Sequence, residues 1–192
     1  YTFRTRAILK AQIEQGWDVA GVTSLRHSAD GPPEETVDGL TFFRTPPGRT
    51  GPSPIGEWRE IGALARRINQ VVDRWRPDVL HAHSPVLTAM AADRVAKARG
   101  LPLVYEIRAF WEDAAVGNGT GREGSIKYKL IRALETRAVR RADAVAVICE
   151  GLRSDLIARG IAADKIVVSP NGVDLALFGT PPARDDALAR TL

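Results

Sequence analysis

The feature that most constrains the fold is a regular alternation of two kinds of segment along the chain. Short runs rich in apolar and β-branched residues lack a clean polar–apolar alternation, which is typical of strands covered on both faces. Segments with apolar residues at helical spacing lie between these runs. Such strand–helix–strand units connect by right-handed crossovers into a parallel sheet. The expected strands are 19–24, 40–45, 79–83, 103–108, 144–149 and 166–169.

The expected helices have recognisable start and stop signals. Pro77 ends one helix, and Ser84-Pro85 offers an N-cap followed by proline at the first helical position of the next. Gly100 and Gly160 stand where a helix C-cap is expected. The expected helices cover about 58–75, 84–100, 125–141 and 150–160. The expected inward face of the first comprises Trp58, Ile61, Leu64, Ala65, Ile68, Val71, Val72 and Trp75, and that of the third comprises Ile126, Leu130, Leu134 and Ala138.

The first recognisable element is a helix, which contains Ile8, Leu9 and Ile13 and ends at Gly16. In a doubly wound domain a strand usually precedes such a helix. We therefore predict an α/β fold with a doubly wound, Rossmann-like, mostly parallel sheet, whose usual first strand is missing from this chain upstream of Tyr1. The absence of an initiator methionine agrees with a start produced by a cut.

Composition narrows the class of protein. The 192 residues, 44% of them hydrophobic, suit one well-buried domain, and no apolar stretch approaches the 18 residues or more of a membrane-spanning helix. The single cysteine, Cys149, can form no internal disulfide, so we expect a reducing cytoplasm. The net charge of +4 allows an anionic partner. Nucleic acid is not expected, because the basic residues lack interleaved exposed aromatics.

Charged and imidazole groups gather where the expected strands finish. Ligands of open parallel sheets bind at the carboxyl ends of the strands, and burying charge is costly without a function or a partner. This clustering therefore predicts a ligand site at that edge of the sheet. The candidate residues found in this way are His81, His83, Ser84, Arg108, Trp111, Glu112, Asp113, Glu150 and Asn171.

The two neighbouring histidines admit several interpretations. His81 and His83 alternate along one strand, so their side chains share a face. A metal site would need a third ligand, and His27 is the only other histidine, so we expect no metal. The remaining alternatives are a structural pair and a contact with substrate or phosphate. The latter would fall mostly to His83, which lies nearer the strand end.

The other candidates also have a structural alternative each. Arg108 could hold a phosphate or carboxylate through its bidentate fork, or form an ion pair with Glu106, Glu112 or Asp113. Trp111 could form a wall for a sugar ring or belong to the core. Glu112 and Asp113 could accept sugar hydroxyls or a proton, or cap the following segment. Glu150 could contact a ligand or simply favour a helix N-terminus.

The expected helix 125–141 is strongly basic. It carries six lysines and arginines against one acidic residue, Glu135. Such a helix could press on an anionic bilayer, and the alternative is a solvated basic face.

Two motifs resemble signatures of the family-4 retaining glycosyltransferases, which have the two-domain GT-B architecture. They are Asp-Val-Leu-His-Ala-His-Ser-Pro at 78–85 and Ser-Pro-Asn-Gly-Val-Asp at 169–174. The segments 105–113 and 148–152 resemble the subgroup associated with exosortase systems and exopolysaccharide assembly. The resemblance implies an N-terminal, acceptor-side domain over 1–178. Residues 179–192 would then begin a linker toward a C-terminal donor-binding domain that this chain lacks.

The resemblance implies transfer of a sugar from a nucleotide diphosphate donor to a growing exopolysaccharide or lipid-linked glycan, with retention and without a metal or other cofactor. A metal can be absent where cationic side chains and helix N-termini stabilise the departing diphosphate. The expected location is the cytoplasm, with peripheral contact at the inner face of the membrane. We expect no turnover by this chain alone.

The resemblance also assigns expected roles. His83 and Arg108 become the catalytic candidates. Tyr1 and Arg4 would follow a glycine-rich turn that comes after the missing first strand, and they would border the cleft between the two domains together with the remaining candidates. One departure is that many relatives have a histidine where Arg108 stands. An arginine cannot act as a general base, but it can grip phosphate or orient an acceptor.

Two other functions remain as alternatives. One is half of a GT-B-like nucleotide-sugar epimerase, which would carry carboxylates in the cleft and in its second domain. The other is a non-enzymatic α/β receiver or ligand-binding domain. A receiver would need an acidic cluster at the end of its first strand.

Overall fold

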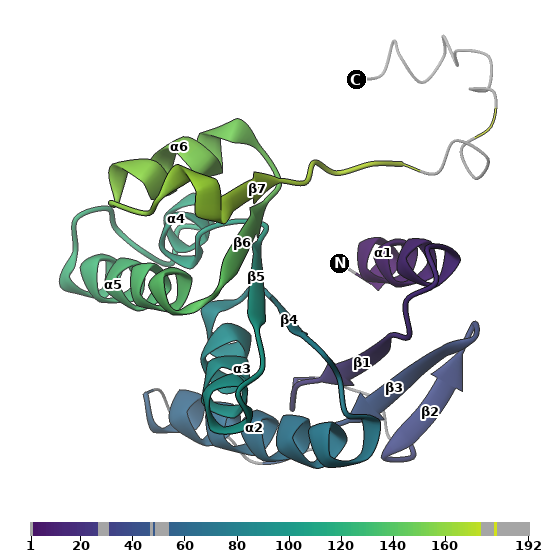
Figure 1. Cartoon of the computed structure of the whole chain (residues 1–192). Coiled ribbons are helices and arrows are strands. Elements are labelled where there is room, and N and C mark those ends of the chain that lie inside the picture. The colour runs from purple at the N-terminus through teal and green to yellow at the C-terminus, as the bar shows by residue number, and fades with distance from the viewer. Residues whose placement is uncertain (1, 27–30, 47, 49–53, 174–178, 180–192) are drawn as a thin grey trace, which may run out of the picture.

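The strands of the protein form two sheets that lie side by side (Figure 1). The computed structural model describes residues 2–26, 31–46, 48, 54–173 and 179. Sheet A has the order β1-β3-β2, and sheet B has the order β4-β5-β6-β7 with all neighbours parallel. The strands are β1 (Ala20–Thr23), β2 (Glu34–Val37), β3 (Leu40–Arg44), β4 (Leu80–His83), β5 (Leu103–Ile107), β6 (Ala144–Val147) and β7 (Ile166–Val168).

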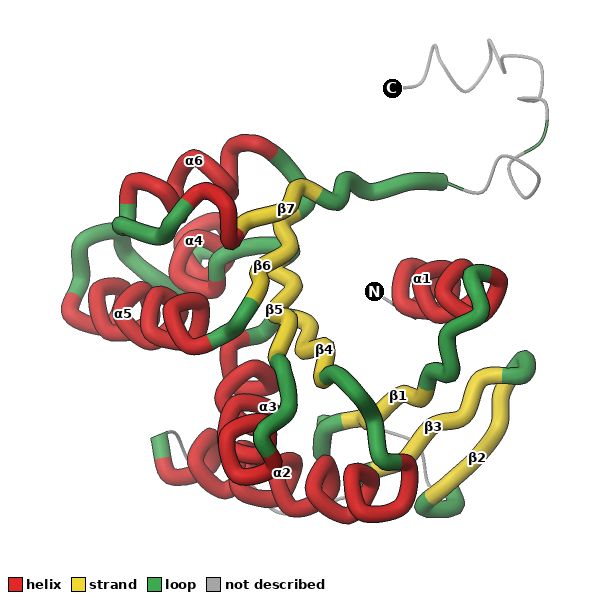
Figure 2. Tube along the Cα trace, viewed as in Figure 1, coloured by secondary structure: helices red, strands yellow, loops and turns green. Residues whose placement is uncertain are grey.

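The helices cover the two faces of sheet B unequally. In Figure 1 sheet B is seen nearly edge-on, with α3, α4, α5 and α6 on one side and α1 on the other. Figure 2 shows the same arrangement by element type, with α2 running beneath both sheets. The helices are α1 (Thr2–Glu14), α2 (Ile55–Trp75), α3 (Val86–Arg99), α4 (Trp111–Gly117), α5 (Ile126–Arg141) and α6 (Glu150–Ala158).

The predicted α/β class and the parallel sheet are confirmed, and each predicted strand is present within two residues of its expected limits. The described strands do not, however, form one continuous sheet, because the outer edges of β1 and β4 pair with no described strand. The predicted strand upstream of Tyr1 stays a prediction, and Tyr1 itself lies outside the described residues.

Two elements were not predicted, namely β2 and α4. Strand β2 pairs antiparallel with β3 through a tight turn at Asp38 and Gly39, whose φ angles are 53° and 78°. Positive φ at both central residues is what a type I′ hairpin turn requires, and Asp-Gly is its strongest sequence signal. The polar residues Glu34 and Glu35 concealed this edge strand, since they break the apolar pattern by which the other strands were found.

The core lies between sheet B and the layer of α2, α3 and α5. Tyr105, Ile107, Val145 and Val147 are buried on the helix side of the sheet. Alternation along the strand turns Glu106 to the opposite face, toward α1. The two faces of sheet B therefore differ in chemistry, with an apolar side under the helices and a polar side under α1.

The inward faces of two helices are confirmed only in part. In α5, Ile126 is 88% exposed and Leu130 is 59% exposed, whereas Leu134 is half-buried and Ala138 is buried as expected. Glu135 and Val139 are also buried, and Glu135 accepts a hydrogen bond from the hydroxyl of Tyr105. Trp58 of α2 is likewise exposed, and Arg94 lies over its ring. None of the described helices is both long and apolar enough to cross a bilayer.

Candidate functional site

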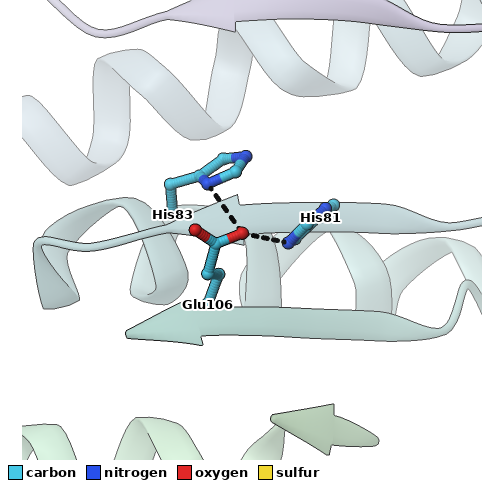
Figure 3. Close-up of side chains that lie close together, drawn as sticks. All are labelled: His81, His83 and Glu106. Atoms are coloured by element: carbon cyan, nitrogen blue, oxygen red, sulfur yellow. Dashed lines mark ion pairs between the residues drawn. The ribbon is translucent and has the colours of Figure 1, made fainter. Parts of the chain in front are cut away.

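A compact polar cluster lies at the carboxyl ends of β4 and β5, on the face of sheet B toward α1. The parallel register pairs His83 with Glu106, and His81 lies two residues earlier on the same face. Figure 3 shows both imidazoles directed at the carboxylate of Glu106 from the neighbouring strand. Strand register, rather than a loop, thus brings these three side chains together.

Glu106 is the centre of this cluster. Its Oε2 lies 3.4 Å from His81 Nε2 and 3.4 Å from His83 Nδ1. Its Oε1 accepts hydrogen bonds from Arg4 Nη2 and Arg108 Nε, each at 3.1 Å. Glu106 was not among the predicted site residues, although the sequence marked it as one possible partner of Arg108. Its position two residues before Arg108 at the end of a strand was the available signal.

The surroundings of Glu106 keep it ionised. Burial raises the pKa of Glu106, but hydrogen bonds from His81, His83 and Arg108 outweigh burial and hold this pKa well below its usual range. The pKa of His83 is lowered, which favours the neutral ring. Burial is the largest cause of its lowered pKa, and His81 and Arg108 lower it further, against the opposing effect of Glu106.

Two contacts meet at Nδ1 of His83. Arg108 Nη2 lies 2.9 Å from this nitrogen, and Glu106 Oε2 lies 3.4 Å from it. A guanidinium can only donate and an ionised carboxylate can only accept, so the two contacts call for opposite tautomers of the ring. His81 stacks against His83 with ring centroids 4.4 Å apart. His83 is therefore held between a guanidinium, a carboxylate and a second imidazole.

Backbone and α1 contacts hold the cluster in place. Ser84 Oγ accepts from the backbone nitrogen of Arg108 at 3.2 Å, and Ser84 N donates to the carbonyl oxygen of Glu106 at 2.8 Å. Arg108 Nη2 also donates to Thr5 Oγ1 at 3.3 Å. These contacts tie the end of β4, the end of β5 and α1 together.

A contact between Arg4 and Asn171 extends the cluster toward the end of β7. Arg4 Nη1 donates to the side-chain oxygen of Asn171, which follows that strand. The structure thus brings together six of the predicted site residues: Arg4, His81, His83, Ser84, Arg108 and Asn171.

Four of the described predicted residues lie outside these contacts, and three of them are at least partly exposed. Trp111 is half-buried, with the guanidinium of Arg26 5.9 Å from its ring centroid. Asp113 is exposed and accepts a 2.8 Å hydrogen bond from the hydroxyl of Tyr128, which raises the pKa of Tyr128 to about 12. Glu150 opens α6, is exposed, and lies 3.5 Å from Arg153.

Glu112 lies on the helix side of the molecule. Its side chain is 0% exposed, and Arg159 Nη1 donates to its Oε1 at 2.8 Å. In the structure Glu112 therefore contacts protein, and the predicted contact with a sugar hydroxyl would require this ion pair to open.

The ligand atoms His81 Nε2, His83 Nδ1 and Glu106 Oε2 lie near enough to one another, within 4.8 Å, to be compared with a metal site. The positive charges around these atoms argue against metal binding. Two guanidinium groups already neutralise the Glu106 carboxylate, and Arg108 occupies His83 Nδ1. A cation would have to displace these permanent positive charges, whereas a phosphate or hydroxyl oxygen would not.

A parallel sheet with polar side chains gathered at the carboxyl ends of its strands is a Rossmann-like arrangement. More specifically, the chain belongs to the family described as the glycosyl transferase 4-like domain, whose profile matches residues 1–172. The predicted family-4 glycosyltransferase resemblance is thereby confirmed.

Similarity to individual proteins covers only parts of longer chains. The chain is 29% identical over 109 residues to a protein of Escherichia coli (strain K12) that is named as a colanic acid biosynthesis glycosyl transferase, WcaI. That match covers 55% of this chain and 26% of the E. coli protein. A UDP-N-acetylglucosamine 2-epimerase from Rickettsia bellii aligns with a TM-score of 0.49 and 17% identity, over 78% of this chain and 36% of the other.

Proposed function

We propose that this chain is the acceptor-side domain of a retaining glycosyltransferase that uses a nucleotide-diphosphate sugar. The acceptor would be a growing exopolysaccharide or a lipid-linked glycan, and the segments 105–113 and 148–152 favour the exosortase- and exopolysaccharide-associated subgroup. The observation that carries the proposal is the convergence of Arg4, His83 and Arg108 on Glu106 at the carboxyl edge of sheet B.

The charge of the cluster suits this chemistry. Arg4 and Arg108 contribute two positive charges and Glu106 contributes one negative charge, so these three side chains carry one net positive charge. A fixed positive charge stabilises the negative charge that develops on a departing diphosphate without the aid of a metal. His83 would contact a phosphate or sugar oxygen, and Asn171 would hold an acceptor hydroxyl.

The domain division that supports this proposal is 1–178 for the acceptor-side domain and 179–192 for the start of a linker. The donor would bind chiefly in a second domain, so that transfer requires both. We therefore propose that the chain by itself does not turn over, and that hexosyl transfer belongs to the full-length protein. We also propose that the protein acts in the cytoplasm, where a reducing environment suits the free Cys149.

We further propose that α5 contacts an anionic membrane. The exposed Ile126 and Leu130 stand among basic residues of the same helix, including the exposed Lys127 and Lys129. An apolar pair framed by lysines is typical of a helix that lies on an anionic lipid surface. Such a contact would attach the protein to the membrane through the side of sheet B opposite the polar cluster.

The test is transfer and donor hydrolysis by the full-length protein across a panel of nucleotide sugars. Because His83 and Arg108 would stabilise charge that develops during transfer, we expect His83→Ala and Arg108→Ala each to lower kcat/KM by about 100-fold. Arg99→Ala is the matched control, since Arg99 is an arginine that pairs with Asp73 away from the cluster. Full transfer activity in both cluster variants would remove this cluster from the site.

A further inference from the structure

A second ionic cluster is buried beneath the helices, outside the candidate site. Arg159 is the C-cap of α6, and its side chain is 4% exposed. Its Nη1 donates to Glu112 Oε1 at 2.8 Å and its Nε to Asp155 Oδ2 at 2.5 Å. Its guanidinium carbon also lies 3.9 Å from the ring centroid of Phe110. One arginine from α6 therefore contacts both Phe110 and Glu112 of the β5–α4 segment.

The position of these two contacts along the chain connects them to the site. Phe110 is the N-cap residue of α4, and Glu112 belongs to the first turn of that helix. Arg108, which contacts His83 and Glu106, lies only two residues before Phe110. Arg159 thus contacts the short segment that follows Arg108 at the end of β5. It does so from the helix side of the sheet, opposite the polar cluster.

The energetics favour a role in geometry over a role in stability. A buried ion pair gains little over apolar residues of the same volume, because both partners lose their hydration. Glu112 Oε2 has no hydrogen-bond partner in the described part of the chain, which adds to this cost. Glu135 is a second buried carboxylate whose charge acts on Glu112 and Arg159. What the arrangement provides is a defined position for the segment between Arg108 and α4.

We propose that Arg159 is a positioning residue, which acts through Phe110 and Glu112 to hold Arg108 against His83 and Glu106. The proposal rests on the proposed function in that Arg108 is taken to act on the ligand. Its structural content, the placement of Arg108, can be measured on the protein without any substrate.

The reporter is the imidazole of His83. Carbon–proton NMR of the histidine Cε1 positions follows its titration in the full-length protein, and the variants His81→Gln and His83→Gln identify the two resonances of the cluster. His83 faces His81, Glu106 and Arg108, and proximity of Arg108 lowers its pKa while Glu106 raises it. Displacement of Arg108 therefore raises the midpoint of the His83 titration.

The decisive comparison makes the same conservative substitution, arginine to lysine, at two positions of the full-length protein. We expect Arg159→Lys to raise the His83 midpoint by about 0.5 pH units, as part of the shift of about one unit expected for the reference variant Arg108→Gln. The control is Arg141→Lys, because Arg141 also forms a partly buried ion pair, with Asp93, but contacts nothing in the β5–α4 segment. We expect no shift of the His83 midpoint in that control.

A second variant keeps the test decisive if Arg159→Lys does not fold. Glu112→Gln is nearly isosteric, retains the stacking of Arg159 on Phe110 and removes the charge, and we expect it to raise the His83 midpoint in the same direction. An unchanged His83 midpoint in the folded variants, with a clear shift in Arg108→Gln, would overturn the positioning role. Failure of the proposed function would be distinguishable. The wild-type protein would then transfer no sugar, while Arg159→Lys would still shift the midpoint of the His83 titration.

Discussion

At the scale of single residues, two buried glutamates on opposite faces of sheet B have opposite protonation behaviour. Glu106 faces α1 and receives hydrogen bonds from arginines and histidines, so it stays ionised. Glu135 belongs to α5 on the other side of the sheet, where the hydroxyl of Tyr105 donates a hydrogen bond to it. Burial is the main cause that raises the pKa of Glu135 to about 7, and the charge of Glu112 adds to this effect. Glu135 therefore exchanges its proton near neutral pH.

The raised pKa of Glu135 predicts a pH dependence of stability. The folded protein holds this proton more tightly than the unfolded chain, so the free energy of unfolding falls as pH rises from about 4.5 to about 7 and then levels off. Glu135→Gln should remove this component, which amounts to about 3 kcal/mol at most, because one pKa unit corresponds to about 1.4 kcal/mol.

Urea unfolding at pH 5 and pH 7.5 measures this difference. The exposed Glu123 provides the matched control, and Glu123→Gln should retain the wild-type change in stability between the two pH values. Equal changes in wild type and Glu135→Gln would contradict the assignment of a near-neutral proton to Glu135.

At the scale of elements, α5 has two faces with separate tasks. Its inner stripe of Glu135, Ala138 and Val139 packs against sheet B and α3. Its outer face exposes Ile126 and Leu130 beside lysines. The inner face stabilises the fold, and the outer face is available for a partner.

The outer face of α5 predicts selective binding to anionic vesicles. Each basic residue near such a surface contributes about 1 kcal/mol, so Lys127→Gln together with Lys129→Gln should weaken partition roughly tenfold to thirtyfold. Co-sedimentation with phosphatidylglycerol vesicles, compared with phosphatidylcholine vesicles, measures this effect.

The control for vesicle binding removes the same charge elsewhere. Lys97 and Arg99 are exposed or half-exposed basic residues at the end of α3, and Lys97→Gln with Arg99→Gln should leave partition unchanged. Equal losses in the two double variants would indicate a general effect of net charge instead of a contact through α5.

An element could be predicted where its signal is a local property of the sequence, and not where it depends on packing. Strands of sheet B could be predicted because continuous apolar runs such as 144–147 are local properties of the sequence. The inward face of α5 could be predicted only in its second half, because the same spacing of four residues continues through Ile126 and Leu130, which are exposed. Burial of Glu135 beside the hydroxyl of Tyr105 depends on packing, which the helix sequence alone does not reveal.

The candidate site was predictable to a similar degree. His83, Arg108 and Asn171 were found because residues at the carboxyl ends of neighbouring parallel strands must converge. The central role of Glu106 depends on register between strands, and the contact of Arg159 depends on packing across 47 positions. No local pattern in the sequence encodes either relation.

At the scale of the whole molecule, the two faces of sheet B differ, and two arginines and two imidazoles surround one carboxylate on the face toward α1. The helices α3 to α6 cover the apolar side of sheet B, while the polar side meets only α1 among the described helices (Figure 1). Arg4 and Arg108 supply fixed positive charge on that side. This distribution suits an anionic ligand better than a metal cation.

Transfer by the full-length protein should therefore be insensitive to chelation. We expect no more than a twofold change in kcat after exhaustive treatment with EDTA, because arginine charge replaces the role of a metal at the leaving group. The control is restoration with added Mg²⁺ or Zn²⁺, which should give no gain. A loss on chelation that Zn²⁺ reverses would assign His81, His83 and Glu106 to metal binding.

The hydrogen bond from Arg4 to Asn171 has a practical meaning for protein engineering. Arg4 and Thr5 occupy the opening turns of α1, yet both reach groups that belong to the second half of the chain. A bulky group introduced in the first turns of α1 would therefore lie beside the polar cluster that an assay is meant to probe. Affinity handles and fluorescent labels are therefore better placed on the far surface, for example on exposed positions of α3.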